Sequence, residues 1–172
     1  MKLNYRRTIF AGLAFMAIFS FWQTYDNIVP LILKNSFHMN EITTGVVMAA
    51  DNILALFLLP LFGTLSDKTE TKWGKRKPYI VIGSLLTVAA IAFMPIGDNA
   101  RSLPMFLIAT GAVLLFMAFF RSPTVALMPD VTPRPLRSKG NAIINLMGYT
   151  GGIIVLVLGK IFATDAPKNA MM

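Results

Sequence analysis

Five long apolar runs alternate with short polar segments along this chain. The runs cover residues 8–33, 42–65, 79–96, 103–125 and 141–162. Each run is close to the roughly 20 residues that a helix needs to cross about 30 Å of hydrocarbon. A helix also satisfies its own backbone hydrogen bonds, which lipid cannot do. The pattern therefore predicts an all-α membrane protein of about five transmembrane helices, with short links that make neighbouring helices antiparallel.

The composition indicates that lipid surrounds most of the folded surface. Of the 172 residues 55% are hydrophobic and only 14% are charged, which is too few charges to cover a soluble domain. The net charge of +8 does not indicate a nucleic-acid partner, because the cations lie in short gaps between membrane-length runs. Five helices are an awkward number for a closed unit, so we expect residues 1–172 to be one partial bundle of a longer protein.

The distribution of cations predicts the orientation in the membrane. With a cytoplasmic N-terminus, eleven Lys and Arg residues fall on the inside and four on the outside. The inside cations are Lys2, Arg6, Arg7, Lys68, Lys72, Lys75, Arg76, Lys77, Arg134, Arg137 and Lys139, and the outside ones are Lys34, Arg101, Lys160 and Lys168. This bias follows the positive-inside rule. It predicts a multi-pass protein of the cell (inner) membrane with its C-terminus outside.

The densest group of cations also has an ordered arrangement, GTLSDKTETKWGKRKP at residues 63–78. Its ordered positions are Gly63, Asp67, Lys68, Gly74, Lys75 and Arg76. A second ordered stretch follows the fourth run and includes Asp130 and Arg137, on the same predicted membrane face. Charge-assisted pairs at a partly dry interface are strong and can have two arrangements. The alternative is an ordinary solvated cluster of charges.

These two stretches resemble the loops after helices two and four in the major facilitator superfamily. The long spacing in the first, with Trp73 before Gly74 and Pro78 closing the basic run, is similar to the glycoside–pentoside–hexuronide carriers and the sucrose–proton symporters. The resemblance implies the first five of twelve helices of a sugar:proton symporter that works by alternating access. In that family such charge pairs hold the inside gate closed. The resemblance implies no enzyme and no cofactor.

Three charges lie inside the apolar runs, at Asp26, Asp51 and Arg121. Such charges are costly in hydrocarbon and need a partner or a wet cavity. Counting residues places both acids roughly 10–14 Å below the outer surface, on consecutive helices. Two carboxylates that meet in a dry cavity repel, so one of them holds its proton more tightly, as proton coupling requires. The alternative is that each acid makes only local hydrogen bonds at a helix contact.

Polar and aromatic neighbours extend this candidate cavity. Aromatic rings beside acids and amides are typical of sugar sites, where a ring stacks on the apolar face and polar groups take hydroxyls. The neighbours are Trp22, Gln23, Tyr25 and Asn27 around Asp26, Asn52 after Asp51, and Asn141 and Asn145 on one face of the last helix. Arg121 lies near the cytoplasmic side, too deep to face either acid directly in a straight helix pair. It either reaches the inner surface or contacts the solute from below.

Protons are favoured over sodium as the coupling ion. Melibiose-type members that use sodium carry two Asp residues on helix two, and the corresponding positions here are Ala55 and Leu59, which offer no oxygen ligands. No metal is therefore expected, and the partners are lipid, a sugar and the missing C-terminal half. The competing hypotheses are a fragment or subunit that does not transport without a partner chain, and a lipid-moving relative.

Overall fold

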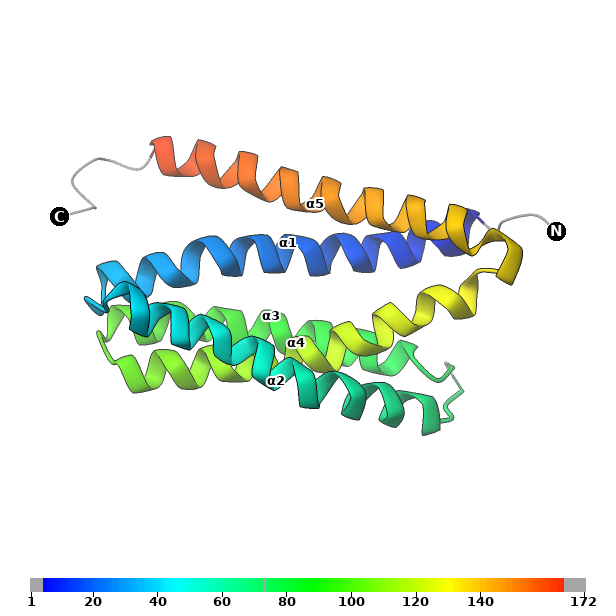
Figure 1. The fold of residues 1–172 in the computed structure, drawn as a ribbon, viewed down its shortest axis with the longest axis horizontal. Helices are drawn as coiled ribbons and strands as arrows, with labels where there is room; N and C mark the ends of the chain where they lie inside the picture. Colours follow the sequence, from blue (N-terminus) through cyan, green and yellow to red (C-terminus); the bar gives the residue numbers. More distant parts are fainter. Residues whose placement is uncertain (1–4, 73, 166–172) are drawn as a thin grey trace. The chain divides into compact units, whose positions relative to one another are not determined.

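The computed structural model describes residues 5–72 and 74–165 (Figure 1). It contains α1 (Tyr5–Asn35), α2 (Glu41–Lys68), α3 (Lys77–Asn99), α4 (Leu103–Val131), a short 3-10 helix η1 (Arg134–Leu136) and α5 (Arg137–Asp165). All five helices are long and apolar enough to cross a membrane, which confirms the predicted fold class. Each helix is longer than its apolar run, since residues beyond the run continue the helix at one or both ends. Lys2, Trp73 and Lys168 lie outside the described residues.

Some of the helices continue through prolines. Pro30 lies inside α1, and Pro123 lies inside α4 together with Pro129. A proline inside a helix removes one backbone hydrogen bond, and neighbouring Ser and Thr side chains or small local adjustments compensate for it in membrane helices. In α4 the Thr124 hydroxyl donates to the Phe120 carbonyl at 2.8 Å, next to Pro123.

Contacts divide the described residues into two units. The first unit holds α1 up to Ile28, η1 and α5. Small residues bring α1 and α5 together: a Cβ atom on Gly151 would lie 2.7 Å from the Met16 carbonyl oxygen, and one on Gly148 would lie 2.9 Å from the Phe19 ring. Such close approach through small residues is a usual way for membrane helices to associate. These two glycines therefore allow the close approach of α1 and α5.

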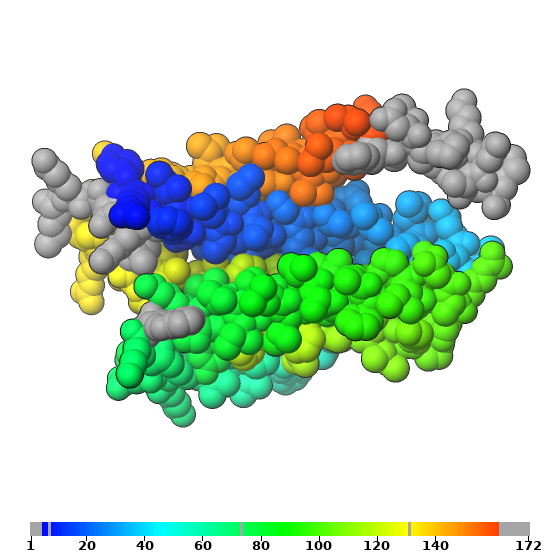
Figure 2. Space-filling view, turned by 180° about the vertical axis from the view of Figure 1, so that it is seen from behind, coloured from blue at the N-terminus to red at the C-terminus, as the bar shows by residue number. Residues whose placement is uncertain are grey.

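The second unit holds residues 29–130, which include α2, α3 and α4. Short links reverse the chain between these helices, so α2 and α4 run in the same direction and α3 runs against both. Gly97 allows the close approach of α3 and α4, since a Cβ there would lie 2.8 Å from the Phe106 backbone nitrogen. Phe106, Val113 and Met117 form the buried face of α4. Figure 2 shows α3 (green) and the first turns of α4 (yellow-green) as a continuous surface.

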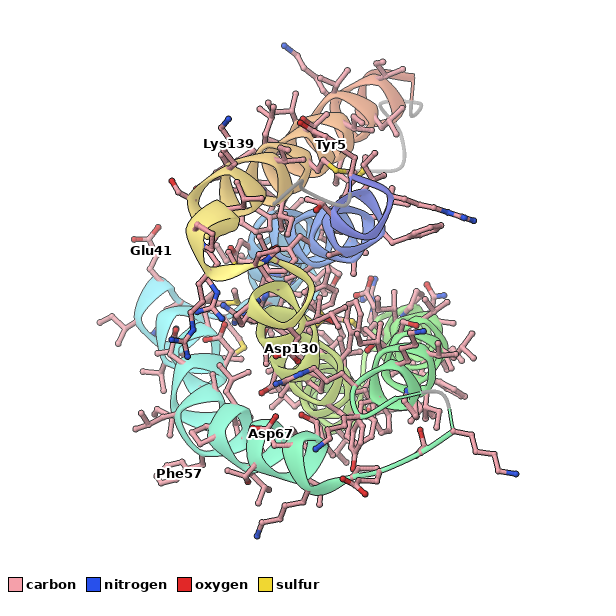
Figure 3. The ribbon with its side chains drawn as sticks, turned by 90° about the vertical axis from the view of Figure 1, so that its right-hand side faces the viewer. Tyr5, Glu41, Phe57, Asp67, Asp130 and Lys139 are labelled. Atoms are coloured by element: carbon pink, nitrogen blue, oxygen red, sulfur yellow. The ribbon has the colours of Figure 1, made fainter. Side chains whose placement is uncertain are left out.

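The outward face of α2 is strongly apolar. Ile42 is 80% exposed and Leu56 is 70% exposed, and Phe57 points away from the other helices of the unit in Figure 3. A helix with this composition in a multi-pass membrane protein exposes that face to lipid or to further helices.

Candidate functional site

Arg76 joins two acids at one end of the second unit, which we call the basic end. Its Nη2 atom lies 2.8 Å from Asp67 Oδ1, and its Nε atom lies 2.6 Å from Asp130 Oδ2. Asp67 is in the last turn of α2, Arg76 precedes α3, and Asp130 is near the end of α4. Figure 3 looks onto this end and labels both acids. The Arg76 side chain is 12% exposed, so one nearly buried guanidinium ties together the ends of three helices.

The link between α2 and α3 has a structure that places Arg76. Gly74 has φ of +100°, a conformation that side chains other than glycine rarely adopt. The Gly74 N–H donates to the Thr71 carbonyl at 2.9 Å, and the Thr71 hydroxyl donates to the Gly74 carbonyl at 2.7 Å. On either side of this turn, the hydroxyls of Thr69 and Tyr79 share a hydrogen bond of 2.6 Å. Gly74 of the motif therefore has a local structural role, which is to turn the chain just before Arg76.

Gly63, the other glycine of the motif, lies inside α2 and has a role in helix packing. A Cβ on Gly63 would lie 3.1 Å from the Ser122 hydroxyl of α4. That hydroxyl donates a hydrogen bond of 2.7 Å to the Leu59 carbonyl. Gly63 thus leaves room for α4 to approach α2. Ser122 was not among the predicted site residues, although a serine beside Arg121 in an apolar run was an available signal.

The remaining cations of the predicted gate stay at the surface. Lys68 is exposed, and Lys75 is exposed with its Nζ atom 3.5 Å from Glu70 Oε1. Arg137 is exposed at the start of α5. Of the eight predicted gate residues, the second unit brings Asp67, Arg76 and Asp130 into direct contact.

Aromatic and polar side chains lie together on α1, as the sequence suggested. The rings of Trp22 and Tyr25 are 5.6 Å apart and nearly perpendicular, and Phe21 packs against both. Tyr25 is buried and Asp26 is exposed. Asn27 does not direct its amide to Asp26, because its Nδ2 atom donates to the Gln23 carbonyl of the same helix at 2.6 Å.

The two asparagines of α5 lie far from this cluster. Asn145 Nδ2 donates to Asn141 Oδ1 at 2.9 Å, so they do share a face. Gly151 contacts Met16 and Ser20 of α1, which places Asn145, six residues earlier, near the level of residues 10–14. Asp26 then lies roughly 20 Å further along α1. A single small solute does not span that distance, so the first unit does not bring these asparagines to Asp26. Their role in a solute cavity stays a prediction.

Asp51 and Arg121 form a second group of charges, in the second unit. Asp51 is 9% exposed and accepts a hydrogen bond of 2.8 Å from Asn52 Nδ2. The role predicted for Asn52 in orienting a carboxyl group stays a prediction, and this hydrogen bond is consistent with it. Arg121 is half-buried. The expectation that Arg121 is too deep to face Asp26 or Asp51 directly stays a prediction.

Comparison with known proteins shows the family of the chain. The sequence profile of the Major Facilitator Superfamily matches residues 6–167. The chain belongs to this superfamily. Membership, together with five membrane-length helices, makes it a multi-pass membrane protein of a transporter family and not an enzyme. No solved structure matches the chain.

Individual members of the superfamily that resemble the chain are named for transport. A Lactose permease of Lactobacillus delbrueckii subsp. bulgaricus is 31% identical over 124 residues, which cover 70% of this chain and 20% of that protein. The Membrane-associated transporter protein of Mus musculus is 29% identical over 130 residues, 68% of this chain and 24% of the relative. Sucrose transport protein SUC3 of Arabidopsis thaliana is 25% identical over 126 residues, 58% of this chain and 21% of the relative. The chain spans about a fifth of the length of these relatives.

Proposed function

We propose that this chain forms the first helices of a sugar:proton symporter that works by alternating access. The observation that carries the proposal is the group of aromatic and polar side chains on α1, Trp22, Gln23, Tyr25 and Asp26, inside a membrane-length helix. Rings beside acids and amides suit a sugar, which offers an apolar face and several hydroxyls. Relatives named lactose permease and sucrose transport protein support a disaccharide or another glycoside as the solute.

A proton is the coupling ion that the residues support best. Asp26 and Asp51 are acids within membrane-spanning segments, where an ionisable residue is by default a candidate for function. A sodium ion takes several oxygen ligands at close range. Ala55 and Leu59, at the positions where sodium-coupled members carry acids, supply none.

The Arg76 bridge acts in this proposal as one side of the inner gate. With the N-terminus in the cytoplasm of a cell with an inner membrane, the basic end faces inward. Arg76 then holds α2 and α4 together through Asp67 and Asp130 while the carrier is closed on that side. Its Nη1 atom is buried and has no hydrogen-bond partner among residues 5–72 and 74–165, so it is available to an acceptor from the rest of the carrier.

Uptake of radiolabelled sugars by cells that express the whole carrier tests this proposal. We expect accumulation of lactose or sucrose that a proton uncoupler abolishes and that replacement of sodium by choline leaves unchanged. Asp26→Asn should abolish accumulation, with Asp98→Asn, at the end of α3, as the matched control. Uptake that needs sodium contradicts the proton. Transport of lipid in place of sugar, or transport only when a separate partner chain is present, supports the competing hypotheses.

A further inference from the structure

The two acids that Arg76 contacts lie at equal distances beyond a proline. Pro60 lies inside α2 and Pro123 lies inside α4. Asp67 follows its proline by seven positions, from 60 to 67, and Asp130 follows its own by seven, from 123 to 130. Seven residues make about two turns, or roughly 10 Å of helix. Each acid is therefore carried by a two-turn segment that begins at a proline, and we call these segments the two arms, residues 60–67 and 123–130.

The arms are joined where they begin. The Ser122 hydroxyl donates to the Leu59 carbonyl at 2.7 Å, and these two residues come directly before the two prolines. At the far ends of the arms, Arg76 contacts both acids. The helices α2 and α4 run in the same direction, and both contacts join residues that are 63 positions apart, 59 with 122 and 67 with 130. The arms therefore run side by side and are linked at both ends, by a neutral hydrogen bond at one and by charges at the other.

Both arms contain features that allow a helix to bend. A proline lacks the N–H that binds the carbonyl four residues earlier, and sharp bends in helices occur mostly at prolines. Hydroxyl groups also take backbone carbonyls as partners in the arms. The Thr124 hydroxyl donates to the Phe120 carbonyl at 2.8 Å, and the Thr64 hydroxyl donates to the Leu61 carbonyl at 2.9 Å. Such local bonds compete with the regular helix pattern, so each helix bends more easily next to its proline than in the turns before it.

The packing of α3 holds α4 ahead of its proline and leaves the arm loosely packed. A Cβ on Gly83 of α3 would lie 3.0 Å from the Phe120 Cα. The rings of Tyr79 and Phe119, also from α3 and α4, are 4.9 Å apart. In the arm of α4, by contrast, none of the described residues 125–130 is buried. Segments with few buried side chains open at a low cost in free energy, so the arm is the part of α4 that moves most readily.

We propose that α2 and α4 share a pivot at the hydrogen bond between Ser122 and Leu59. Beyond this bond the two arms swing apart when Arg76 releases an acid, and the helices ahead of the prolines stay packed. Ser122 is then a positioning residue, since it holds the two bending points together while the arms separate. The inference deepens the proposed function, on which it rests only for the use of the motion, the opening of the inner gate. A bend of about 20° in an arm of roughly 10 Å displaces its end by roughly 3 Å, which is enough to separate a carboxylate from a guanidinium.

Distances between spin labels on the full 172-residue chain in lipid nanodiscs test the pivot. The chain has no cysteine, so labels attach only at introduced ones. One pair of labels, at Lys68 and Met128, reports on the arms. A second pair, at Leu56 and Leu115, reports on the helices ahead of the prolines, and none of these four side chains is buried. We expect Arg76→Gln, which removes the guanidinium, to lengthen the distance of the arm pair by roughly 3 Å or more and to leave the second pair unchanged.

Two results of this measurement would overturn the pivot. An arm pair that keeps its distance in Arg76→Gln would mean that the arms do not swing. An equal change in both pairs would mean that α2 and α4 separate as whole helices. If Arg76→Gln does not give a folded chain, the same two distances in the milder Arg76→Lys variant decide between these results and the expected one.

Substitutions at the pivot distinguish it from a general loosening of the unit. In the Arg76→Gln background, Pro123→Ala should roughly halve the displacement of the arm pair, because one of the two arms then stays straight. Pro95→Ala, inside α3, is the matched control and should leave the displacement unchanged. Ser122→Ala should let the second pair separate as well, whereas Ser84→Ala, whose hydroxyl bonds within α3, should not. An undiminished displacement in Pro123→Ala, or a second pair that stays in place in Ser122→Ala, would contradict the inference.

Failure of the pivot and failure of the proposed function are distinguishable, because none of these measurements uses a solute. Arms that swing in a carrier that takes up no sugar would contradict the proposed function alone. Rigid arms in a carrier that accumulates sugar with protons would contradict the pivot alone.

Discussion

The Nε atom of Arg76 donates to Asp130 Oδ2 at 2.6 Å, although 54 positions of the sequence separate the two residues. The same guanidinium reaches Asp67 at 2.8 Å through Nη2. The rigid planar fork of an arginine holds its donors in fixed directions, whereas a lysine ammonium is a compact charge on a flexible stem. The contacts that join the helix ends at the basic end of the second unit therefore depend on both the charge and the shape of the Arg76 side chain.

Replacing Arg76 by Lys tests the importance of that shape. A lysine ammonium keeps the charge but does not reproduce two directed contacts, so Arg76→Lys should lower the free energy of unfolding by about 1–2 kcal/mol. Thermal unfolding of the purified chain in detergent measures the change. Lys72→Gln, an exposed change in the same link, should leave stability nearly unaffected. Equal stability of Arg76→Lys and the original chain would show that the fork is dispensable.

Gly74 and Gly111 should respond in opposite ways to alanine. Gly74 has φ of +100°, so Gly74→Ala should cost about 1 kcal/mol or more and displace Arg76 from its acids. Gly111 lies inside α4 with nothing within 4 Å of an added Cβ, so Gly111→Ala should be neutral or stabilise by up to about 1 kcal/mol. Unfolding midpoints of the two variants, measured side by side, give the comparison. A harmless Gly74→Ala would contradict the described turn.

The contact of α1 with α5 depends on Gly151. A Cβ there would lie 2.7 Å from the Met16 carbonyl and 2.8 Å from the Ser20 hydroxyl, so Gly151→Ala should push the helices apart and cost about 2 kcal/mol. Gly159→Ala, on the same helix with nothing within 4 Å, is the matched control. Because the chain has no cysteine, a pair introduced at Gln23 and Gly152, whose Cβ atoms would lie 4.0 Å apart, can report the separation through the rate of disulfide formation. An unchanged rate in Gly151→Ala would argue against this interface.

Arg101 offers a stabilising change. It follows α3 with φ of +49°, and the next residue, Ser102, donates its N–H to the Gly97 carbonyl at 3.1 Å, the geometry of a helix end that favours glycine. Arg101→Gly should therefore raise the free energy of unfolding by about 0.5–1 kcal/mol. Arg101→Lys keeps the backbone preference and the charge, and should change nothing. A drop in stability for Arg101→Gly would mean that the guanidinium contributes more than the backbone strain costs.

The helices and the basic end follow from the sequence because they depend on local composition. Membrane-length apolar runs leave few alternatives to helices, and acids and cations at consecutive helix ends were bound to meet at one face. The partners within the membrane were harder to predict. Asn27 had both a neighbouring acid and a carbonyl four residues earlier within reach, and its side-chain rotamer decides between them.

Contacts between helices depend on how far one helix is shifted along the other, which no periodicity records. The hydrogen bond from the Ser122 hydroxyl to the Leu59 carbonyl sets the position of α4 along α2, and no pattern in the sequence reveals it. The separation of Asn145 from Asp26 likewise depends on where Gly151 meets Met16 and Ser20. Sequence reasoning found these residue types but not their distances.

A guanidinium that is paired with two carboxylates can lose them one at a time. If α4 moves and Asp130 departs, Arg76 still holds Asp67, and the reverse is equally possible. Neither departure leaves the Arg76 guanidinium without a carboxylate, so neither step carries the full penalty of an unpaired charge. The basic end of the second unit would therefore open in two steps, through an intermediate in which Arg76 keeps one of its two acids.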